Sequence, residues 1–166
     1  MKAIKVKSVP NIEEMIDARK KVLIDTFCYV GERCIIEARE GGTYMDQTGN
    51  LRSSIGYAVI LNGKIVQMAL GDVVKTGNKG NSKGEEFLTE HIKKAQKRGI
   101  QLIVTAGMNY AEYVEAKGYN VLTSAELKAE PMIHSLLTRL GFKLKYGEDS
   151  KANRKGRVPH YQEQCA

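Results

Sequence analysis

Side chains that could act as nucleophiles or metal ligands stand singly along this chain of 166 residues. The cysteines and histidines are Cys28, Cys34, Cys165, His91, His134 and His160. The spacing of the first two cysteines fits neither a zinc site nor a disulfide framework. The sequence has no GxSxG nucleophile elbow, and its carboxylates are spread among lysines rather than clustered for metal-assisted hydrolysis. We therefore expect no catalysis, no metal site and no cofactor.

Two features could recognise phosphate groups. Residues 77–80, GNKG, match the GXXG backbone clamp of KH domains, although so short a pattern arises readily by chance in a lysine-rich segment. The chain also carries 26 Lys and Arg against 19 Asp and Glu, a net charge of +7, which favours attraction to polyanions. Its basic stretches lack the interleaved aromatic residues of single-strand binding surfaces. A basic nucleic-acid-binding accessory protein is the alternative hypothesis for function.

Length and composition predict one globular domain. A folded chain of this mass buries roughly 69% of its surface, which is enough for a single core. The apolar content of 42% excludes wholesale disorder. The sequence has no run of about 18 apolar residues, so no membrane span is expected, and its first residues lack the continuous apolar stretch of a signal peptide. We expect a single domain over residues 1–146 and a polar C-terminal tail over residues 147–166.

A long helix is predicted over residues 11–38, with Asn11 as its N-cap. Apolar residues at helical spacing form one stripe: Ile12, Met15, Ile16, Val22, Leu23, Phe27 and Val30. A second apolar set, Ile24, Cys28 and Ile35, follows a different face. A helix with two apolar faces must be covered on two sides. Either another helix of the same chain or a neighbouring subunit covers the second set, which makes these three residues a candidate subunit interface.

An antiparallel hairpin is the clearest structural signal in the chain. Residues 53–61 and 64–70 are extended runs, and Asn62-Gly63 between them supplies the positive φ angles of a type I′ turn. The Gly- and Lys-rich segment 71–84 follows. It has too few apolar residues to offset the entropy of ordering, so we predict that it is a mobile loop.

The rest of the chain predicts two helices and a strand. A capping box at Ser82 begins a helix that ends before Gly99, and residues 100–105 form a buried strand. A second capping box, at Thr123, begins a helix that ends near Leu140. This order of elements predicts an α+β fold. It has a long N-terminal helix, an antiparallel β-sheet built on the Asn-Gly hairpin, and two further helices packed on the sheet.

Two blocks of the sequence resemble one family. The stretch TGNLRSSIGY, residues 48–57, is similar to the TGxLRxSI signature of the tail-completion or head–tail joining proteins of long-tailed bacteriophages, also called minor tail components. Within AGMNYAEYVEAKGYNVL, residues 106–122, the chain resembles that family's YAxYVE segment. The residues that match the family motif are Thr48, Gly49, Asn50, Leu51, Arg52, Ser54, Ile55, Tyr110, Ala111, Tyr113, Val114 and Glu115.

The resemblance implies a virion structural protein, synthesised in the bacterial cytoplasm, that completes or joins the head–tail junction. Relatives form rings, so it also implies a homo-oligomeric ring in the particle, in contact with other connector or tail-tube proteins. The chain departs from the family pattern in its Gly- and Lys-rich insertion and its polar C-terminal extension. Because Arg52 and Glu115 come from different blocks, we hypothesise from the family spacing that they form an ion pair across the fold.

Overall fold

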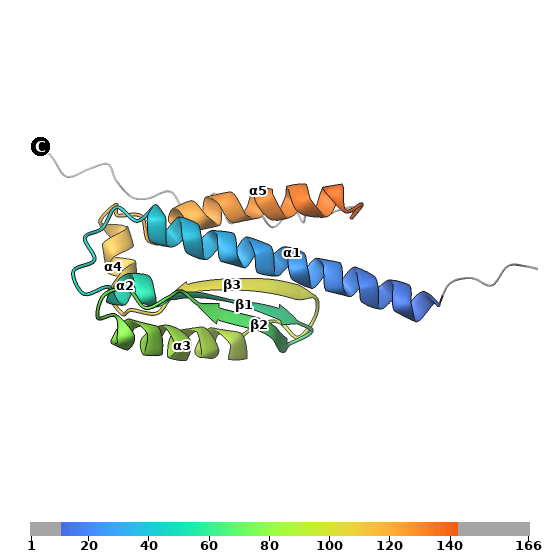
Figure 1. Cartoon of the computed structure of the whole chain (residues 1–166), viewed down its shortest axis with the longest axis horizontal. Coiled ribbons are helices and arrows are strands. Elements are labelled where there is room, and N and C mark those ends of the chain that lie inside the picture. Colours follow the sequence, from blue (N-terminus) through green and yellow to red (C-terminus); the bar gives the residue numbers. More distant parts are fainter. Residues whose placement is uncertain (1–10, 143–166) are drawn as a thin grey trace, which may run out of the picture.

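The computed structural model describes residues 11–142 of the chain. Its helices and strands are α1 (Ile12–Glu40), α2 (Asn50–Ser53), β1 (Ile55–Leu61), β2 (Lys64–Leu70), α3 (Asn78–Lys93), β3 (Ile100–Ala106), α4 (Ala111–Ala116) and α5 (Thr123–Arg139). The three strands form an antiparallel sheet in the order β2-β1-β3. Helices α1 and α3 cover opposite faces of this sheet, and α5 packs along α1 (Figure 1). The predicted α+β fold is confirmed, with α5 resting on α1 rather than directly on the sheet.

Helix α1 extends beyond the body of the molecule at its N-terminal end (Figure 1). It begins as predicted, because the Asn11 side chain accepts a hydrogen bond from the backbone N–H of Glu13 at 3.2 Å. Its buried residues are Phe27, Val30, Gly31, Cys34, Ile35 and Ala38. Every residue from 12 to 22 is exposed. Only the C-terminal half of α1 therefore serves the core of this chain.

The hairpin forms as the sequence predicts. Asn62 and Gly63 have φ angles of 52° and 78°, as a type I′ turn requires, and they join β1 directly to β2. Strand β1 lies between two partners and two helices, so its residues 55–60 are all buried. The strand begins at Ile55 rather than at residue 53, because Asn50–Ser53 form the short helix α2.

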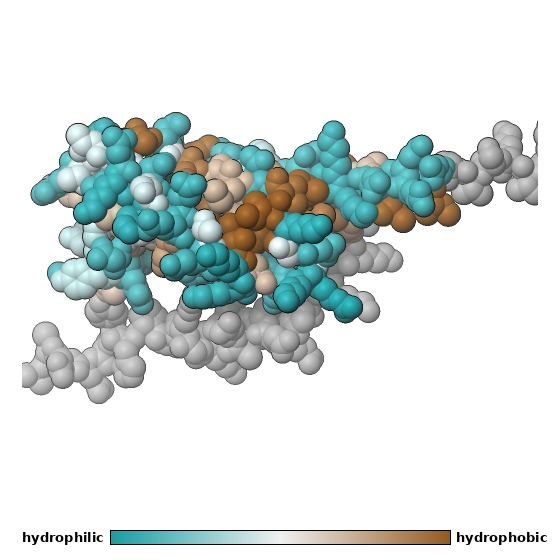
Figure 2. Space-filling model, turned by 90° about the horizontal axis from the view of Figure 1, so that it is seen from below, coloured by the Kyte–Doolittle hydropathy of each residue, from teal (hydrophilic) through white to brown (hydrophobic). Residues whose placement is uncertain are grey.

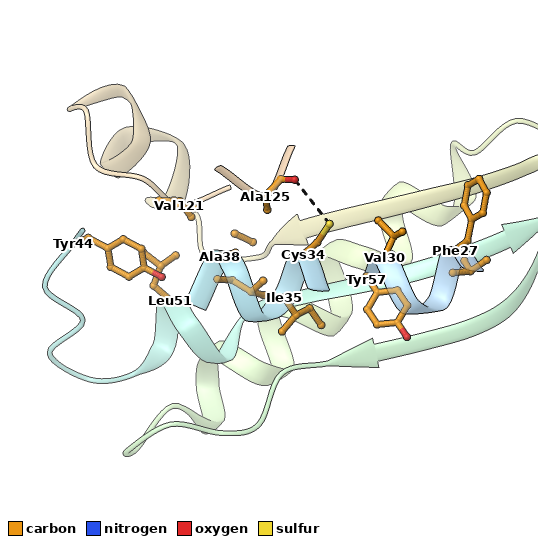
Figure 3. Packing of buried hydrophobic residues seen from close by; sticks show 14 of the residues in the cluster. Phe27, Val30, Cys34, Ile35, Ala38, Tyr44, Leu51, Tyr57, Val121 and Ala125 are labelled. Carbon is orange, nitrogen blue, oxygen red and sulfur yellow. Dashed lines mark hydrogen bonds between the residues drawn. The ribbon is translucent and has the colours of Figure 1, made fainter. Parts of the chain in front are cut away.

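A contact between Gly31 and Tyr57 joins α1 to the sheet. The Tyr57 ring lies so close to Gly31 that an added Cβ atom would be 2.3 Å from a ring carbon. The Tyr57 hydroxyl donates a hydrogen bond of 2.8 Å to the Glu32 carboxylate, one residue further along α1. Figure 3 shows the Tyr57 ring beside the helix, close to Val30. Burial, and then the hydrogen bond to Glu32, raise the pKa of Tyr57.

The prediction of a mobile loop over residues 71–84 is wrong for its second half. Helix α3 begins at Asn78, so Ser82 does not begin it, and the helix ends at Lys93. Gly80 and Gly84 are buried against backbone atoms of residues 50 and 54, which a larger side chain would hold apart. These glycines pack a helix closely rather than loosening a loop, a role that composition does not reveal. Residues 71–77 remain outside helices and strands.

Helix α5 runs through Pro131 from Thr123 to Arg139. The sulfur of Cys34 approaches the carbonyl oxygen of Ala125 at 3.9 Å, which places the C-terminal part of α1 against the first turn of α5 (Figure 3). The predicted tail, residues 147–166, and the last residues of the predicted domain, 143–146, lie outside the described residues.

Replacing Gly80 with alanine tests the close contact between α3 and α2. A Cβ atom at residue 80 would lie 2.0 Å from the backbone oxygen of Asn50. We expect Gly80→Ala to lower the free energy of unfolding by about 2 kcal/mol, although helix propensity alone would raise it by about 1 kcal/mol. Urea denaturation measures the change. Ser82→Ala, at an exposed position of the same helix, should change stability by less than about 0.5 kcal/mol. A Gly80→Ala protein as stable as the parent would contradict the packing.

Replacing Tyr57 with phenylalanine tests its buried hydrogen bond. We expect Tyr57→Phe to cost about 1 kcal/mol at neutral pH. Because the pKa of Tyr57 is raised in the folded state, its stabilising contribution is present at neutral pH and is lost as the pH rises above the ordinary value of 10.0. The parent should therefore lose stability above that pH more steeply than Tyr57→Phe, measured by urea denaturation across the alkaline range. Equal slopes for the two proteins would count against this assignment.

Candidate protein-interaction surfaces

The first motif block builds a turn that holds the start of α3. The Asp46 carboxylate accepts hydrogen bonds from the backbone N–H groups of Gly49, at 2.9 Å, and Arg52, at 3.1 Å. The bond from Arg52 satisfies one of the backbone donors in the first turn of α2. The Asn50 side chain accepts from the N–H of Gly80 at 2.9 Å. Asp46 lies outside the motif, and sequence reasoning did not single it out.

A serine and a glycine of the same turn fix the segment that leads into α3. The Ser53 hydroxyl oxygen accepts from the N–H of Val74 at 2.8 Å. Gly49 has a φ angle of 77°, and an added Cβ atom would lie 2.0 Å from the Val74 carbonyl oxygen. Leu51 and Ile55 are buried in the core beside this turn, and Ser54 is buried too. The first block is therefore an architectural element.

The second block caps α5. One oxygen of the Glu115 carboxylate accepts hydrogen bonds from the backbone N–H groups of Leu122, at 3.0 Å, and Thr123, at 2.7 Å, and from the Thr123 hydroxyl at 2.5 Å. A negative charge at the positive end of a helix stabilises it. The capping box predicted at Thr123 is wrong, because Thr123 is already helical and its hydroxyl donates to Glu115. A carboxylate eight residues away in sequence replaces the local cap.

The fold brings the two blocks together at one end of the molecule. Thr48 and Leu51 from the first block and Tyr110 and Val114 from the second line one cavity of about 200 Å³. Tyr44, Met45, Asp46 and Gln47 complete its wall. Ala111 is buried beneath it in the same core cluster as Leu51. Residues about sixty positions apart in sequence thus form one structural unit, which the order of the blocks alone does not specify.

The ion pair hypothesised between Arg52 and Glu115 does not form. The Arg52 guanidinium lies over the Tyr44 ring, 5.6 Å from its centroid, and Glu115 is used by the first residues of α5. The Nε atom of Arg52 and the hydroxyl of Tyr44 are buried without a hydrogen-bond partner within residues 11–142. Burial raises the pKa of Tyr44, which keeps its phenol neutral. The ion pair inferred from the family spacing is therefore wrong.

Two exposed residues line this cavity, Met45 and Tyr110, and two more exposed tyrosines follow in the second block. We name these four residues the tyrosine surface: Met45, Tyr110, Tyr113 and Tyr119. Met45 is 86% exposed and Tyr113 is 61% exposed. Tyrosine and methionine are enriched in protein–protein interfaces, where their large side chains fill pockets on a partner. Motif residues Tyr110 and Tyr113 are therefore exposed to solvent, whereas motif residues Leu51 and Ala111 are buried.

The predicted interface on α1 needs correction. Ile35 is only 5% exposed and belongs to the core of its own chain. Ile24 and Cys28 are half-buried, and Cys28 packs against that same core. Gly31, which lies on this face between Cys28 and Ile35, packs against Tyr57 of the sheet. Because Ile35 is buried within its own chain, it offers nothing to a neighbouring subunit.

The exposed apolar surface of α1 lies instead at its projecting end. Ile12, Met15 and Ile16 are 63%, 56% and 48% exposed; we name these three residues the α1 projection. Figure 2 shows hydrophobic surface at this end of the molecule, beyond the sheet. Further along the helix, a groove of about 500 Å³ between α1 and α5 is lined by Val22, Tyr29, Leu136 and Leu140, among others. Periodicity identified these residues as part of one apolar stripe, but it did not distinguish the exposed end of the stripe from its buried part.

The residues that the structure describes provide few groups suited to catalysis or metal binding. No three His, Cys, Asp or Glu side chains within residues 11–142 gather so that they could hold a metal ion. Burial raises the pKa of Cys34, and burial together with Asp25 and Glu32 raises that of Cys28. Both thiols are therefore protonated at neutral pH and are poor nucleophiles.

Two lysines of the Gly- and Lys-rich segment 71–84 make contacts within the chain. Lys75 donates to the backbone oxygen of Asp46 at 2.6 Å, and Lys83 pairs with Glu86 at 2.6 Å. The basic residues of the C-terminal tail lie outside the described residues. Helices within residues 11–142 lack the combination of length and apolar character that a membrane span needs.

Comparison of the chain with protein-family models, with curated proteins and with solved structures finds no match.

Replacing Glu115 tests its role as a remote helix cap. Glu115→Ala removes the acceptor of three hydrogen bonds, and we expect it to lower the free energy of unfolding by about 1–2 kcal/mol. Glu115→Gln keeps one acceptor oxygen without the charge, so it should cost roughly half as much. Thermal and urea unfolding measure both changes. Glu112→Ala, at an exposed position of α4, is the control. Equal stability of Glu115→Ala and the control would contradict the capping role.

Proposed function

We propose that this chain is a virion structural protein of a long-tailed bacteriophage that completes or joins the head–tail junction. Copies of the chain assemble into a ring, and the ring contacts other connector or tail-tube proteins. The resemblance of the two motif blocks supports the choice of family. Their meeting around one cavity supports treating them as one unit, since a chance match would not require Leu51 and Val114 to share a wall. No covalent chemistry is part of this function.

One observation carries the proposal of assembly, namely the exposed apolar end of α1. The eleven exposed residues 12–22, which include Ile12 and Ile16, bury no side chain in the core of their own chain. Apolar residues on a projecting helix are typical of a surface that another protein covers.

The tyrosine surface lies at the opposite end of the molecule from the α1 projection (Figure 1). Two different surfaces at opposite ends suit head-to-tail contacts, in which one surface of a copy meets another surface of the next copy. Such contacts generate a ring when the rotation between copies closes.

The α1 projection can be tested in the phage or prophage that encodes the chain. Loss of the chain should leave heads and tails that do not join, as seen by electron microscopy. Supplying the parent chain should restore infectious particles. Supplying Ile12→Glu/Ile16→Glu should not, because two buried charges in an assembly contact are strongly unfavourable.

The folded state of that double variant must be intact for the test to count. Both positions are exposed, so its stability should change by less than about 0.5 kcal/mol per site, measured by thermal unfolding. Lys21→Glu, an exposed charge change on the same helix, is the matched control and should restore particles. Normal particles formed without the chain would refute the head–tail role. Restoration by the double variant would refute the role of the projection.

A further inference from the structure

We propose that residues 2–9 of a second copy add as a strand to the free edge of β3 and place Ile4 and Val6 in a groove beneath α5. This inference rests on the assembly proposed above and specifies one contact within it. Three independent features carry it: an apolar groove, an open strand edge beside that groove, and a segment whose sequence fits both.

The groove lies between β3 and α5 and has a volume of about 460 Å³. Its walls are apolar and come from three elements: Cys34 of α1, Leu102 and Val104 of β3, and Ala129 and Ile133 of α5. These five side chains are buried or half-buried, yet the space between them is open. Such a space accepts aliphatic side chains that enter from outside the strand edge.

Strand β3 offers backbone hydrogen bonds at the mouth of this groove. Within residues 11–142 it pairs only with β1, so its other edge is open. The N–H of Gly107 donates to the backbone oxygen of Ser54, and the N–H of Asn62 donates to the backbone oxygen of Gly99. In an antiparallel pair with this register, the backbone N–H and C=O groups of the odd-numbered residues of β3 point toward β1. The backbone groups of Leu102 and Val104 therefore point to the open edge, while their side chains line the groove.

The segment KAIKVKSV, residues 2–9, has the pattern of a strand that adds to such an edge. Ile4 and Val6 alternate with Lys5 and Lys7, so a strand places both apolar side chains on one face. Added strands gain affinity from main-chain hydrogen bonds and specificity from pockets for alternate side chains. Three lysines and no carboxylate occur in this segment, and the exposed carboxylates of Glu126 and Glu130 border the groove. These opposite charges favour the encounter.

The donor must be a second copy because the chain's own segment is too short. Helix α1 rises about 1.5 Å per residue, so Cys34 lies about 35 Å along the helix from Asn11. Five extended residues from Asn11 to Val6 span at most about 17 Å. Turned back along α1, Val6 therefore reaches no further than the level of Val22. Figure 1 shows the N-terminal end of α1 away from the sheet, and so away from β3 of the same chain.

Disulfide trapping between two full-length copies tests the contact. The native cysteines are first replaced as Cys28→Ser, Cys34→Ala and Cys165→Ser. A copy carrying Val6→Cys is mixed with a copy carrying Leu102→Cys or Val104→Cys under mild oxidation, and non-reducing gels measure the heterodimer. Directly opposite residues of adjacent strands have Cβ atoms close enough for a disulfide. Because its side chain points to the opposite face, Lys5→Cys in place of Val6→Cys should give about tenfold less heterodimer.

Each other outcome of this experiment overturns the inference. Equal trapping by Lys5→Cys and Val6→Cys would show that the segment contacts β3 without pairing with it in a defined strand register. Trapping by Tyr161→Cys instead of Val6→Cys would show that the C-terminal tail occupies the groove. No trapped species by Val6→Cys would show that the segment does not reach β3.

Hydrogen exchange on the parent chain provides a second test that does not depend on the cysteine replacements. Amides of residues 100–106 should exchange about tenfold more slowly at a concentration at which copies associate than in dilute solution. Full-length Ile4→Asp/Val6→Asp should lose this protection. Protection retained by that variant, or a chain that stays monomeric, would overturn the strand contact. The particle assay described above decides the head–tail role separately, so the two proposals can fail independently.

Discussion

Close contact between two stretches of backbone, at Gly49 and Gly80, determines where the rest of the domain can lie. Any side chain at Gly80 would collide with the backbone of Asn50, and any side chain at Gly49 would collide with Val74. Since these glycines allow contact, the amide of Asn50 and the hydroxyl of Ser53 reach the backbone of the approaching segment. Helix α3 is thereby seated on one face of the sheet. The contact consists of short, directional hydrogen bonds that a small increase in separation would break.

The second structural joint is electrostatic. Glu115 connects α4 to the first turn of α5, and α5 in turn packs along α1. Motif residues of both blocks therefore act mainly as architecture. They hold in place the surface residues around them, of which Met45 belongs to neither block and Tyr119 is not among the matching motif residues.

Burial is distributed unevenly along the chain, and this supports an assembly role. Strand β1 is buried on both faces, while the first eleven residues of α1 are exposed together with their apolar side chains. Among residues 11–142, nothing pairs with the second edge of strand β3, which lies beside an apolar groove. A domain that acts alone gains nothing from these features, because exposed apolar surface and unpaired strand edges favour association. In a ring, neighbouring copies would cover them.

The sequence by itself determined the local elements. Asn62-Gly63 specifies a two-residue turn because few other residues adopt two positive φ angles, and apolar spacing specifies a long helix that begins after Asn11. Tertiary structure decided which residues meet. It buried Ile35 and exposed Ile16, gave α5 a cap from Glu115, and made Gly80 a packing residue rather than part of a loop. Hydrophobic periodicity shows that a helix face is apolar but not what covers that face. Likewise, a glycine in the sequence does not show whether it makes the chain flexible or allows another element to approach closely. Only the positions of the other elements distinguish these cases.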